Sequence, residues 1–421
     1  MQHQIKWRFL MMICFMILLV GMVPAWGAEE QTELGYTPLS ELIPKGATTV
    51  IFRDEAISAS MAEYYDWMQN SDGSYSLADI AKMKYFSVFS QSPIDLSEIQ
   101  LFPNLTSLTI YEAPEVTGVS ALSQCQRLDA LSFSKVAEMN VPELVKATPQ
   151  ITYVSFSECG ELDYKAIVGW EKLTGVDLEG STVRDLSHLS QIPKLESLYI
   201  RNMPNADFAS CQDLTRLHSV AVYENNRLQD PILWQLITRN ANLERLVLGS
   251  WYIFETYDLD DTVFPNLGNL KELAIYGATI QNLGFLQNCP DLTFLVFENC
   301  SFVSREFEGL GSLKKLNELV LKNVGLTDVS FVRGMNLSLL WLEDNNITDI
   351  SPFIDAEQIQ KLSLLGNPVE DCAPLTQIKG LKKLFCDNSE GLPALKNVEV
   401  ERLFGLWQFE TSSFEEQIPQ E

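Results

Sequence analysis

Residues 316–368 read LNELVLKNVGLTDVSFVRGMNLSLLWLEDNNITDISPFIDAEQIQKLSLLGNP. One pattern occurs three times in this stretch, with aliphatic residues at positions 1, 4 and 6 of each copy: Leu316-x-x-Leu319-x-Leu321, Leu337-x-x-Leu340-x-Leu342 and Ile359-x-x-Leu362-x-Leu364. Positions 4 and 6 alternate as in a β-strand, so both side chains leave the same face. One copy cannot bury that face alone, so the pattern predicts that copies stack around a continuous core.

Position 9 of the second and third copies is Asn, at Asn345 and Asn367. An Asn side chain can satisfy backbone groups where the chain leaves a strand, which a buried turn requires. Asp-Val-Ser follows the first copy at residues 328–330, and Asp-Ile-Ser follows the second at residues 349–351. They predict short helical or 3₁₀ turns on the return path of each copy.

The same frame extends over most of the chain. Position 1 falls at fourteen places, most of them 22 residues apart: Met83, Leu105, Leu128, Ile151, Leu173, Leu195, Leu217, Leu243, Leu270, Leu292, Leu316, Leu337, Ile359 and Leu381. This pattern resembles the leucine-rich repeat family from about residue 83 to 388. The resemblance implies an α/β fold class: a solenoid of about 13–14 repeats, a right-handed superhelix with a curved parallel sheet on its concave face.

The two ends of the chain differ from the repeats. Lys6 and Arg8 precede the apolar run 9–23, and small residues then favour signal-peptide cleavage after residue 27. The alternative is an uncleaved membrane anchor. Residues 28–82 are predicted to form a helical N-terminal cap similar to that of internalin-like bacterial secreted proteins, with Ser76 and Asp79 as a helix-capping pair. Residues 389–421 are predicted to be a C-terminal cap and acidic tail.

The charge balance excludes some partners. The formal net charge is −26, from 30 basic and 56 acidic residues. Removing residues 1–27 takes away two basic residues and no acidic ones, which leaves 28 − 56 = −28. Nucleic acid is not an expected partner, because neutralising phosphates needs Lys and Arg. We also expect no membrane insertion after signal cleavage.

Seven cysteines remain once Cys14 leaves with the signal peptide. Cys159 and Cys300 occupy position 9, where the leucine-rich repeat family accepts Cys in place of Asn. The pattern predicts buried free thiols rather than disulfides or a metal site. Cys372 with Cys386 is the one pair that suggests a bridge.

No catalytic motif stands out. The mature chain has two histidines, His188 and His218, without a nucleophile in a recognisable frame. Asp258-x-Asp260-Asp261 and Asn70-x-Asp72-Gly73 faintly resemble cation sites, but solvated turns are the simpler interpretation. The sequence therefore predicts no catalytic residue, no metal and no cofactor.

Positions 3, 5 and 7 of each strand point away from the core. In the first repeats these positions hold small or polar residues. From the sixth repeat on they hold aromatic residues with acidic residues beside them. Exposed aromatic residues ringed by charge are typical of protein-binding sites. The predicted partner-binding residues are Tyr199, Tyr223, Tyr276, Phe294, Val296, Glu298, Glu318, Trp341 and Glu343, with Trp251 and Tyr252 from the insertion 249–264. Alternatively, these aromatics stack to stiffen the sheet, or a loop covers them.

The sequence thus predicts a secreted or cell-surface, non-enzymatic leucine-rich repeat protein that binds a protein partner through its concave face. One alternative is a carbohydrate-binding surface protein, since aromatic platforms with acids also suit sugars. Another is a hydrolase with its site on the 249–264 insertion, which would need a carboxylate pair near Asp258. The pattern carries no signal for an oligomeric state.

Overall fold

The computed structural model describes residues 37–223, 230–250, 258–259, 264–304, 307–387 and 398–401. These residues fall into two compact units, one ending at Leu195 and one beginning at Glu196, and each is described by itself. The predicted signal peptide and most of the predicted C-terminal cap and tail lie outside the described residues. Within the described ranges, no helix is both long and apolar enough to cross a membrane.

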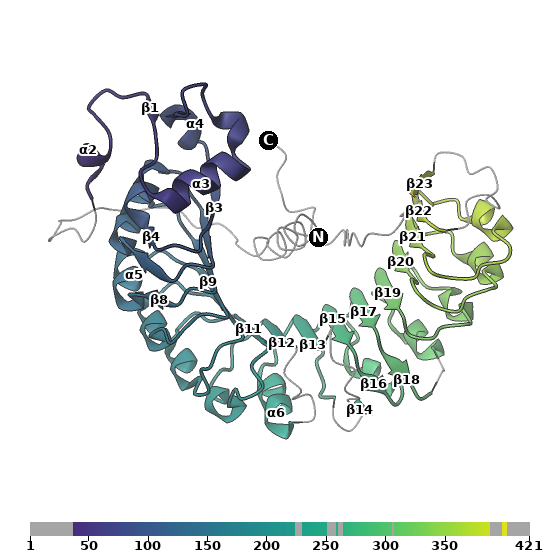
Figure 1. The fold of residues 1–421 in the computed structure, drawn as a ribbon. Coiled ribbons are helices and arrows are strands. Elements are labelled where there is room, and N and C mark those ends of the chain that lie inside the picture. Colours follow the sequence, from purple (N-terminus) through teal and green to yellow (C-terminus); the bar gives the residue numbers. More distant parts are fainter. Residues whose placement is uncertain are drawn as a thin grey trace. The chain divides into compact units, whose positions relative to one another are not determined.

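The first unit is built on a parallel sheet whose neighbouring strands pair in register (Figure 1). Its strands are β3 (Tyr85–Phe89), β5 (Ser107–Tyr111), β7 (Ala130–Ser134), β9 (Tyr153–Ser157) and β10 (Gly175–Glu179). A smaller parallel sheet holds β4 (Ile94–Asp95), β6 (Glu115–Thr117) and β8 (Glu138–Met139). The return segments are η2 (Leu96–Leu101), η3 (Val119–Gln124), α5 (Val141–Ala147), η4 (Tyr164–Gly169) and η5 (Ser187–Gln191).

Short helices precede β3, the first strand of the main sheet in this unit. They are α2 (Leu39–Leu42), α3 (Glu55–Tyr64), η1 (Asp66–Met68) and α4 (Leu77–Ile80), with β1 (Thr49–Val50) and β2 (Tyr75–Ser76) paired antiparallel between them. Buried Glu98 of η2 accepts hydrogen bonds from the backbone N–H groups of Arg53 and Asp54. The Ser60 hydroxyl accepts one from the Phe89 N–H of β3 at 3.0 Å. These bonds fix the helical segment to the start of the sheet, and the last one satisfies a backbone group of β3 that an uncovered first strand would leave open.

The predicted capping pair in this segment is wrong in one respect. Helix α4 does begin after Ser76, but the Ser76 side chain makes no capping hydrogen bond to the helix. The Asp79 carboxylate instead forms an ion pair with Lys82 Nζ at 2.7 Å, one turn further on. A side-chain cap is present on a different helix, α3, where Asp54 accepts a hydrogen bond from Ile57 N–H at 2.9 Å.

The second unit has the longer sheet. Its parallel strands are β11 (Ser197–Arg201), β12 (Ser219–Tyr223), β13 (Arg245–Gly249), β15 (Glu272–Tyr276), β17 (Phe294–Glu298), β19 (Glu318–Lys322), β20 (Leu339–Trp341), β21 (Lys361–Ser363), β22 (Lys383–Phe385) and β23 (Glu399–Glu401). The return segments are η6 (Phe208–Cys211), α6 (Pro231–Arg239), η7 (Gly284–Asn288), η8 (Glu308–Ser312), η9 (Ser330–Val332), η10 (Ser351–Asp355) and η11 (Ala373–Gln377). Strand β23 pairs with β22 beyond the last repeat that the sequence pattern marks.

A small parallel sheet accompanies these return segments (Figure 1). It holds β14 (Asp258–Leu259), β16 (Thr279–Ile280) and β18 (Ser301–Phe302). Strand β14 belongs to the 249–264 insertion, so this part of the insertion pairs within the small sheet and not within the main one. Residues 251–257 and 260–263 lie outside the described residues.

The leucine-rich repeat fold that the sequence pattern predicts is confirmed. In each of the fourteen predicted frames, a strand begins two residues after position 1. The side chains at positions 4 and 6 are buried, and those of Leu319 and Leu321 have no solvent exposure. Burying an aliphatic side chain of this size stabilises the fold by about 1.5–3 kcal/mol, so the stacked rows supply much of its stability.

The prediction for position 9 is also confirmed. Buried Asn345 accepts hydrogen bonds from the N–H groups of Val324 and Leu326 at 3.0 and 3.1 Å. Its side-chain nitrogen donates to the carbonyl of Leu321 at 2.7 Å. In another repeat Cys300 fills the same slot, and its Sγ donates to the carbonyl of Ile275.

All seven cysteines of the described residues are buried, and none of these seven is in a disulfide. This confirms the prediction of buried thiols and removes the suggested bridge between Cys372 and Cys386. Burial raises the pKa of Cys125, Cys289 and Cys300 to about 12. Because the thiolate is the reactive form, these side chains act as small apolar residues of the core.

Candidate functional site

The main sheet of the second unit has one side packed on the repeat core and one side that faces away from it. We call the side that faces away from the core the outer sheet face. It consists of the side chains at positions 3, 5 and 7 of the repeats. Because the strands are parallel and in register, these side chains form three rows across the sheet. The position-3 row is Ser197, Ser219, Arg245, Glu272, Phe294, Glu318, Leu339, Lys361 and Lys383. The position-5 row is Tyr199, Ala221, Val247, Ala274, Val296, Val320, Trp341, Ser363 and Phe385. The position-7 row begins Arg201, Tyr223, Gly249, Tyr276, Glu298 and Lys322.

The structure places the predicted partner-binding residues in these rows, but it does not expose them equally. Five are partly exposed: Tyr199, Tyr223, Tyr276, Glu318 and Glu343. Four that were expected to be exposed are buried, with exposed fractions of 7% for Phe294, 5% for Val296, 6% for Glu298 and 4% for Trp341. Trp251 and Tyr252 lie outside the described residues.

The burial of these four corrects the expectation that the outer sheet face is solvated throughout. Neighbouring strands of a sheet are about 4.8 Å apart, so large side chains in one row pack against each other sideways. Val320 lies in register between Val296 and Trp341, and the Trp341 and Phe385 rings are 6.5 Å apart, edge to face. Aromatic and branched side chains at this end of the face therefore form a second packed layer.

The tyrosines have smaller neighbours. In the position-7 row, Gly249 lies between Tyr223 and Tyr276. A side chain is excluded there, since the backbone has a φ of +112° and a Cβ atom would collide with the Tyr276 carbonyl oxygen. Ala221 and Ala274 are the position-5 residues of the same strands as these tyrosines. Both rings retain solvent-exposed surface beside these small residues.

Polar contacts orient these rings. The Tyr199 hydroxyl lies 3.0 Å from the Ser219 Oγ of the next strand. The guanidinium of Arg201 lies over the Tyr223 ring at 5.8 Å from its centroid, within the range of a cation–π contact. Burial of its hydroxyl end raises the pKa of Tyr276, and nearby Glu298 adds to the effect. The phenol of Tyr276 therefore stays neutral at physiological pH.

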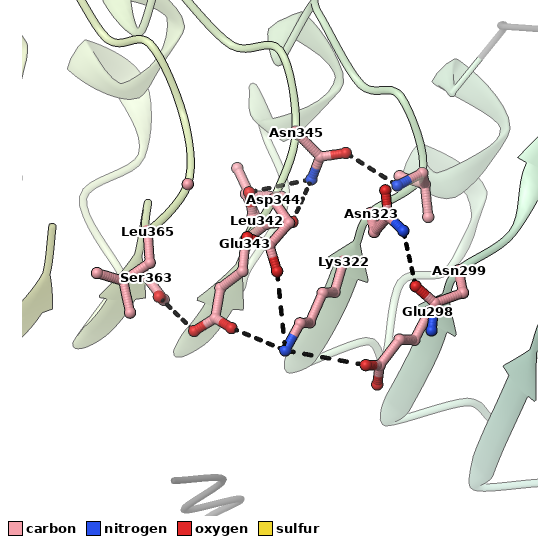
Figure 2. Close-up of polar contacts among 12 residues, drawn as sticks. Glu298, Asn299, Lys322, Asn323, Leu342, Glu343, Asp344, Asn345, Ser363 and Leu365 are labelled. Carbon is pink, nitrogen blue, oxygen red and sulfur yellow. Dashed lines mark hydrogen bonds and ion pairs between the residues drawn. The ribbon is translucent and has the colours of Figure 1, made fainter. Parts of the chain in front are cut away.

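A buried cation lies further along the position-7 row (Figure 2). Lys322 is 2% exposed, and its Nζ lies 3.3 Å from Glu343 Oε2, 3.8 Å from Glu298 Oε1 and 4.0 Å from Asp344 Oδ2. The Ser363 hydroxyl donates to Glu343 Oε1 at 2.7 Å. Burial raises the pKa of Glu298, and the charge of Lys322 opposes that rise. The cluster links the ends of four successive strands.

Sequence reasoning included Glu298 and Glu343 among the binding residues and missed Lys322. A signal was present, because Glu, Lys and Glu occupy position 7 of three successive repeats. In the structure the lysine lies between the acids and offsets part of their charge. Position 8 beside it adds a second interaction, in which Asn323 Nδ2 donates to Asn299 Oδ1 at 2.7 Å. Both Asn residues have positive φ, which Asn tolerates better than most residues.

Catalytic chemistry finds little support in these residues. In the described part of the chain, no group of three His, Cys, Asp or Glu residues could hold a metal ion. His188 is buried, and burial lowers its pKa, so its ring is neutral at physiological pH. Asp260 and Asp261 of the suggested carboxylate cluster lie outside the described residues.

No protein-family model matches the chain, and no curated protein matches it. Several solved structures are similar at low identity. The internalin InlF of Listeria monocytogenes is 17% identical with a TM-score of 0.46, over 85% of this chain and 97% of that one. A leucine-rich repeat protein of Leptospira interrogans is 17% identical with a TM-score of 0.43, over 77% and 97%. The functional domain of InlJ from Listeria monocytogenes is 15% identical with a TM-score of 0.38, over 79% of each chain. Likenesses this distant carry no argument about partners.

Proposed function

We propose that this leucine-rich repeat protein is a secreted, non-enzymatic binding protein that takes a protein partner on the outer sheet face of its second unit. The observation that carries the proposal is the group of partly exposed tyrosines, Tyr199, Tyr223 and Tyr276, on strands that also present Ala221, Gly249 and Ala274. The three tyrosine rings lie outside the repeat core, so packing of that core does not require them. Tyrosine supplies a large, rigid contact area at low entropic cost, and it is enriched where partners bind most tightly.

Charge around the tyrosines supports the same proposal. Arg245 Nε of β13 and Glu272 Oε2 of β15 are 2.6 Å apart, and both side chains remain partly exposed, on the two strands that carry Gly249 and Tyr276. Glu318 and Glu343 lie further along the sheet. An apolar and aromatic centre with a charged rim is the usual composition of a protein interface. The leucine-rich repeat pattern predicts that this face lies on the concave side of the solenoid, where a partner would meet several repeats at once.

Removing the tyrosines tests the proposal. Tyr223→Ala and Tyr276→Ala should each weaken binding about thirtyfold, since truncating an interface hot spot costs about 2 kcal/mol or more. The partner would first be captured from the native extracellular medium, and its affinity for purified variants measured by calorimetry. Melting temperature should change little, because both rings lie outside the repeat core.

Tyr85→Ala is the control, because Tyr85 also points away from the core, at position 3 of its repeat, and is 52% exposed, but belongs to the first unit. It should bind as the unchanged protein does. Full affinity in both tyrosine variants of the second unit would overturn the proposal. A glycan bound in an array screen, and lost in the same two variants, would favour the carbohydrate-binding alternative.

Secretion rests on the N-terminal sequence, and it has its own test. If the apolar run 9–23 is the core of a signal peptide, protein recovered from the culture medium should begin at or near Ala28. Intact-mass measurement of that protein decides the point. Protein that retains Met1 and fractionates with membranes would show an anchor instead.

A further inference from the structure

A row of hydroxyl groups crosses the first three strands of the main sheet in the first unit. Ser87 of β3, Thr109 of β5 and Ser132 of β7 lie directly opposite one another in the parallel register, at position 5 of their repeats. Position 5 points away from the repeat core, and neighbouring strands are about 4.8 Å apart, so the three side chains form a continuous line on that side of the sheet. We call these three residues the hydroxyl row.

Within the described residues, the hydroxyl row makes no side-chain hydrogen bond, and neither does the hydroxyl group of Ser107 at position 3 of β5. Thr109 is 5% exposed and Ser107 is 6% exposed, yet neither oxygen is among the fully enclosed side-chain atoms that lack a partner. Further along the same side of the sheet, by contrast, the Tyr153 hydroxyl donates to Asp177 Oδ2 at 3.3 Å. Polar groups set this deeply are as a rule hydrogen-bonded, so these hydroxyls are available to a ligand.

Aromatic rings border the hydroxyl row on both sides. Tyr85, at position 3 of β3, is 52% exposed. At position 7, the partly exposed ring of Phe89 stacks on that of Tyr111, with centroids 4.4 Å apart and an angle of 8° between the rings. Tyr64, the last residue of α3, also contacts Phe89, at a centroid distance of 5.0 Å, so the helical segment helps to hold this border in place. The face of an aromatic ring is electron-rich and attracts weakly positive C–H groups.

The same side of the sheet carries no basic group. Positions 3, 5 and 7 of β3, β5, β7, β9 and β10 hold no Lys or Arg, and their two acids are Asp177 and Glu179. Each acid accepts a hydrogen bond from a neighbouring strand, Asp177 from Tyr153 and Glu179 from Ser157 at 2.9 Å. An anionic ligand would find no cation on this surface. Ser and Thr hydroxyls each donate one hydrogen bond and accept two, so the surface matches an uncharged ligand with many hydroxyl groups.

We propose that the hydroxyl row and its aromatic borders form a binding site for an uncharged oligosaccharide. The sugar hydroxyls supply the hydrogen bonds that Ser87, Thr109 and Ser132 do not make within the described residues. The C–H face of a sugar ring packs on Tyr85. Because the row crosses three strands, the sugar chain runs across the strands and contacts several repeats. This site lies on a different unit from the proposed protein-binding face and takes a different class of ligand.

The test uses isothermal titration calorimetry on the purified full chain. The probes are neutral hexasaccharides of glucose, N-acetylglucosamine and mannose, with an oligogalacturonate as the anionic probe. At least one neutral probe should bind, and the anionic probe should not. Thr109→Val removes one hydroxyl at nearly constant volume and should weaken binding about two- to tenfold, the range for one hydrogen bond. Tyr85→Ala removes the ring on which the sugar packs and should weaken binding by a similar factor.

Thr174→Val is the matched control. Thr174 is in the same unit at position 2 of its repeat, where its hydroxyl donates to the carbonyl of Thr152 at 3.1 Å. The substitution is the same, and oligosaccharide affinity should not change. Thr109→Val should also keep or raise the melting temperature, because it removes an unpaired hydroxyl from a nearly buried side chain. A lower melting temperature in Thr109→Val would count against the proposal, since it would show that the hydroxyl serves the fold.

Three results would overturn the inference: no neutral probe binds, Thr109→Val and Tyr85→Ala bind as the unchanged protein does, or Thr174→Val loses as much affinity. Tyr276→Ala separates this site from the proposed protein-binding face. It should keep oligosaccharide affinity and lose affinity for the captured partner, whereas Thr109→Val should do the reverse. Oligosaccharide binding lost in Tyr276→Ala but kept in Thr109→Val would place the sugar on the second unit and overturn this inference. Partner binding lost in Thr109→Val but kept in Tyr276→Ala would overturn both proposals.

Discussion

Lys322→Met is expected to lower the free energy of unfolding by about 3–5 kcal/mol, the usual cost of removing one partner from a buried ion pair. Glu298, which is 6% exposed, and Glu343 lie on either side of the strand that carries Lys322. The variant leaves these two carboxylates without the cation between them. Two carboxylates in a half-buried row then repel each other. Urea unfolding at neutral pH, followed by circular dichroism, measures the change.

Lys315→Met is the control for the loss of a lysine ion pair at the surface. Lys315 Nζ is 2.6 Å from Asp291 Oδ1, but the side chains are 59% and 41% exposed. Exposed pairs contribute about 0–1 kcal/mol, so this variant should unfold nearly as the unchanged protein does. The triple variant Lys322→Met, Glu298→Gln, Glu343→Gln should recover much of the loss, because no buried charge remains. Similar stability of the two single variants would show that the buried cluster is not needed by the fold.

The loss in Lys322→Met should also depend on pH. Burial already raises the pKa of Glu298, and removing the lysine removes the charge that opposes that rise. A carboxyl group with a higher pKa in the folded state favours folding when protonated, and this contribution is lost as the pH rises through the folded-state pKa. The deficit relative to the unchanged protein should therefore be largest at neutral pH and shrink as the pH falls through the raised pKa of Glu298. A deficit that is constant with pH would contradict this explanation.

Asn345→Ala is the second large effect, with an expected loss of about 3 kcal/mol or more. The side chain accepts hydrogen bonds from two buried N–H groups, of Val324 and Leu326, and donates to the carbonyl of Leu321. A buried polar group left without a partner costs about 1–3 kcal/mol. Thermal and urea unfolding both measure the change.

The adjacent residue provides the control. Asn346 is exposed, and Asn346→Ala should change stability by less than about 0.5 kcal/mol. Asn345→Cys should be intermediate, because Cys300 uses its Sγ to donate to the corresponding carbonyl, but a thiol accepts hydrogen bonds poorly. Equal stability of the Ala variants at 345 and 346 would mean that the backbone groups of this turn find water instead.

Much of the fold could be predicted because the repeat is a local pattern. Alternation at positions 4 and 6 places every strand of the fourteen predicted frames, and the period of about 22 residues stacks them into one row of aliphatic side chains per position. Asn345 and Cys300 were assigned to the buried turn for the same reason. The role of a residue can be predicted from sequence when it depends only on the position of that residue within its own repeat.

Which side chains of the outer sheet face are exposed could be known only from the tertiary structure. Trp341, at position 5, and Tyr276, at position 7, both point away from the repeat core. Trp341 is nevertheless buried beside Val320, whereas Tyr276 stays partly exposed beside Gly249. Exposure there depends on the size of side chains one strand away, which are more than twenty residues distant along the chain. Lys322 was missed for the same reason, because its charge matters only once the parallel register sets it between Glu298 and Glu343. Local sequence determines which way a strand residue points, and the neighbouring repeats determine what it meets.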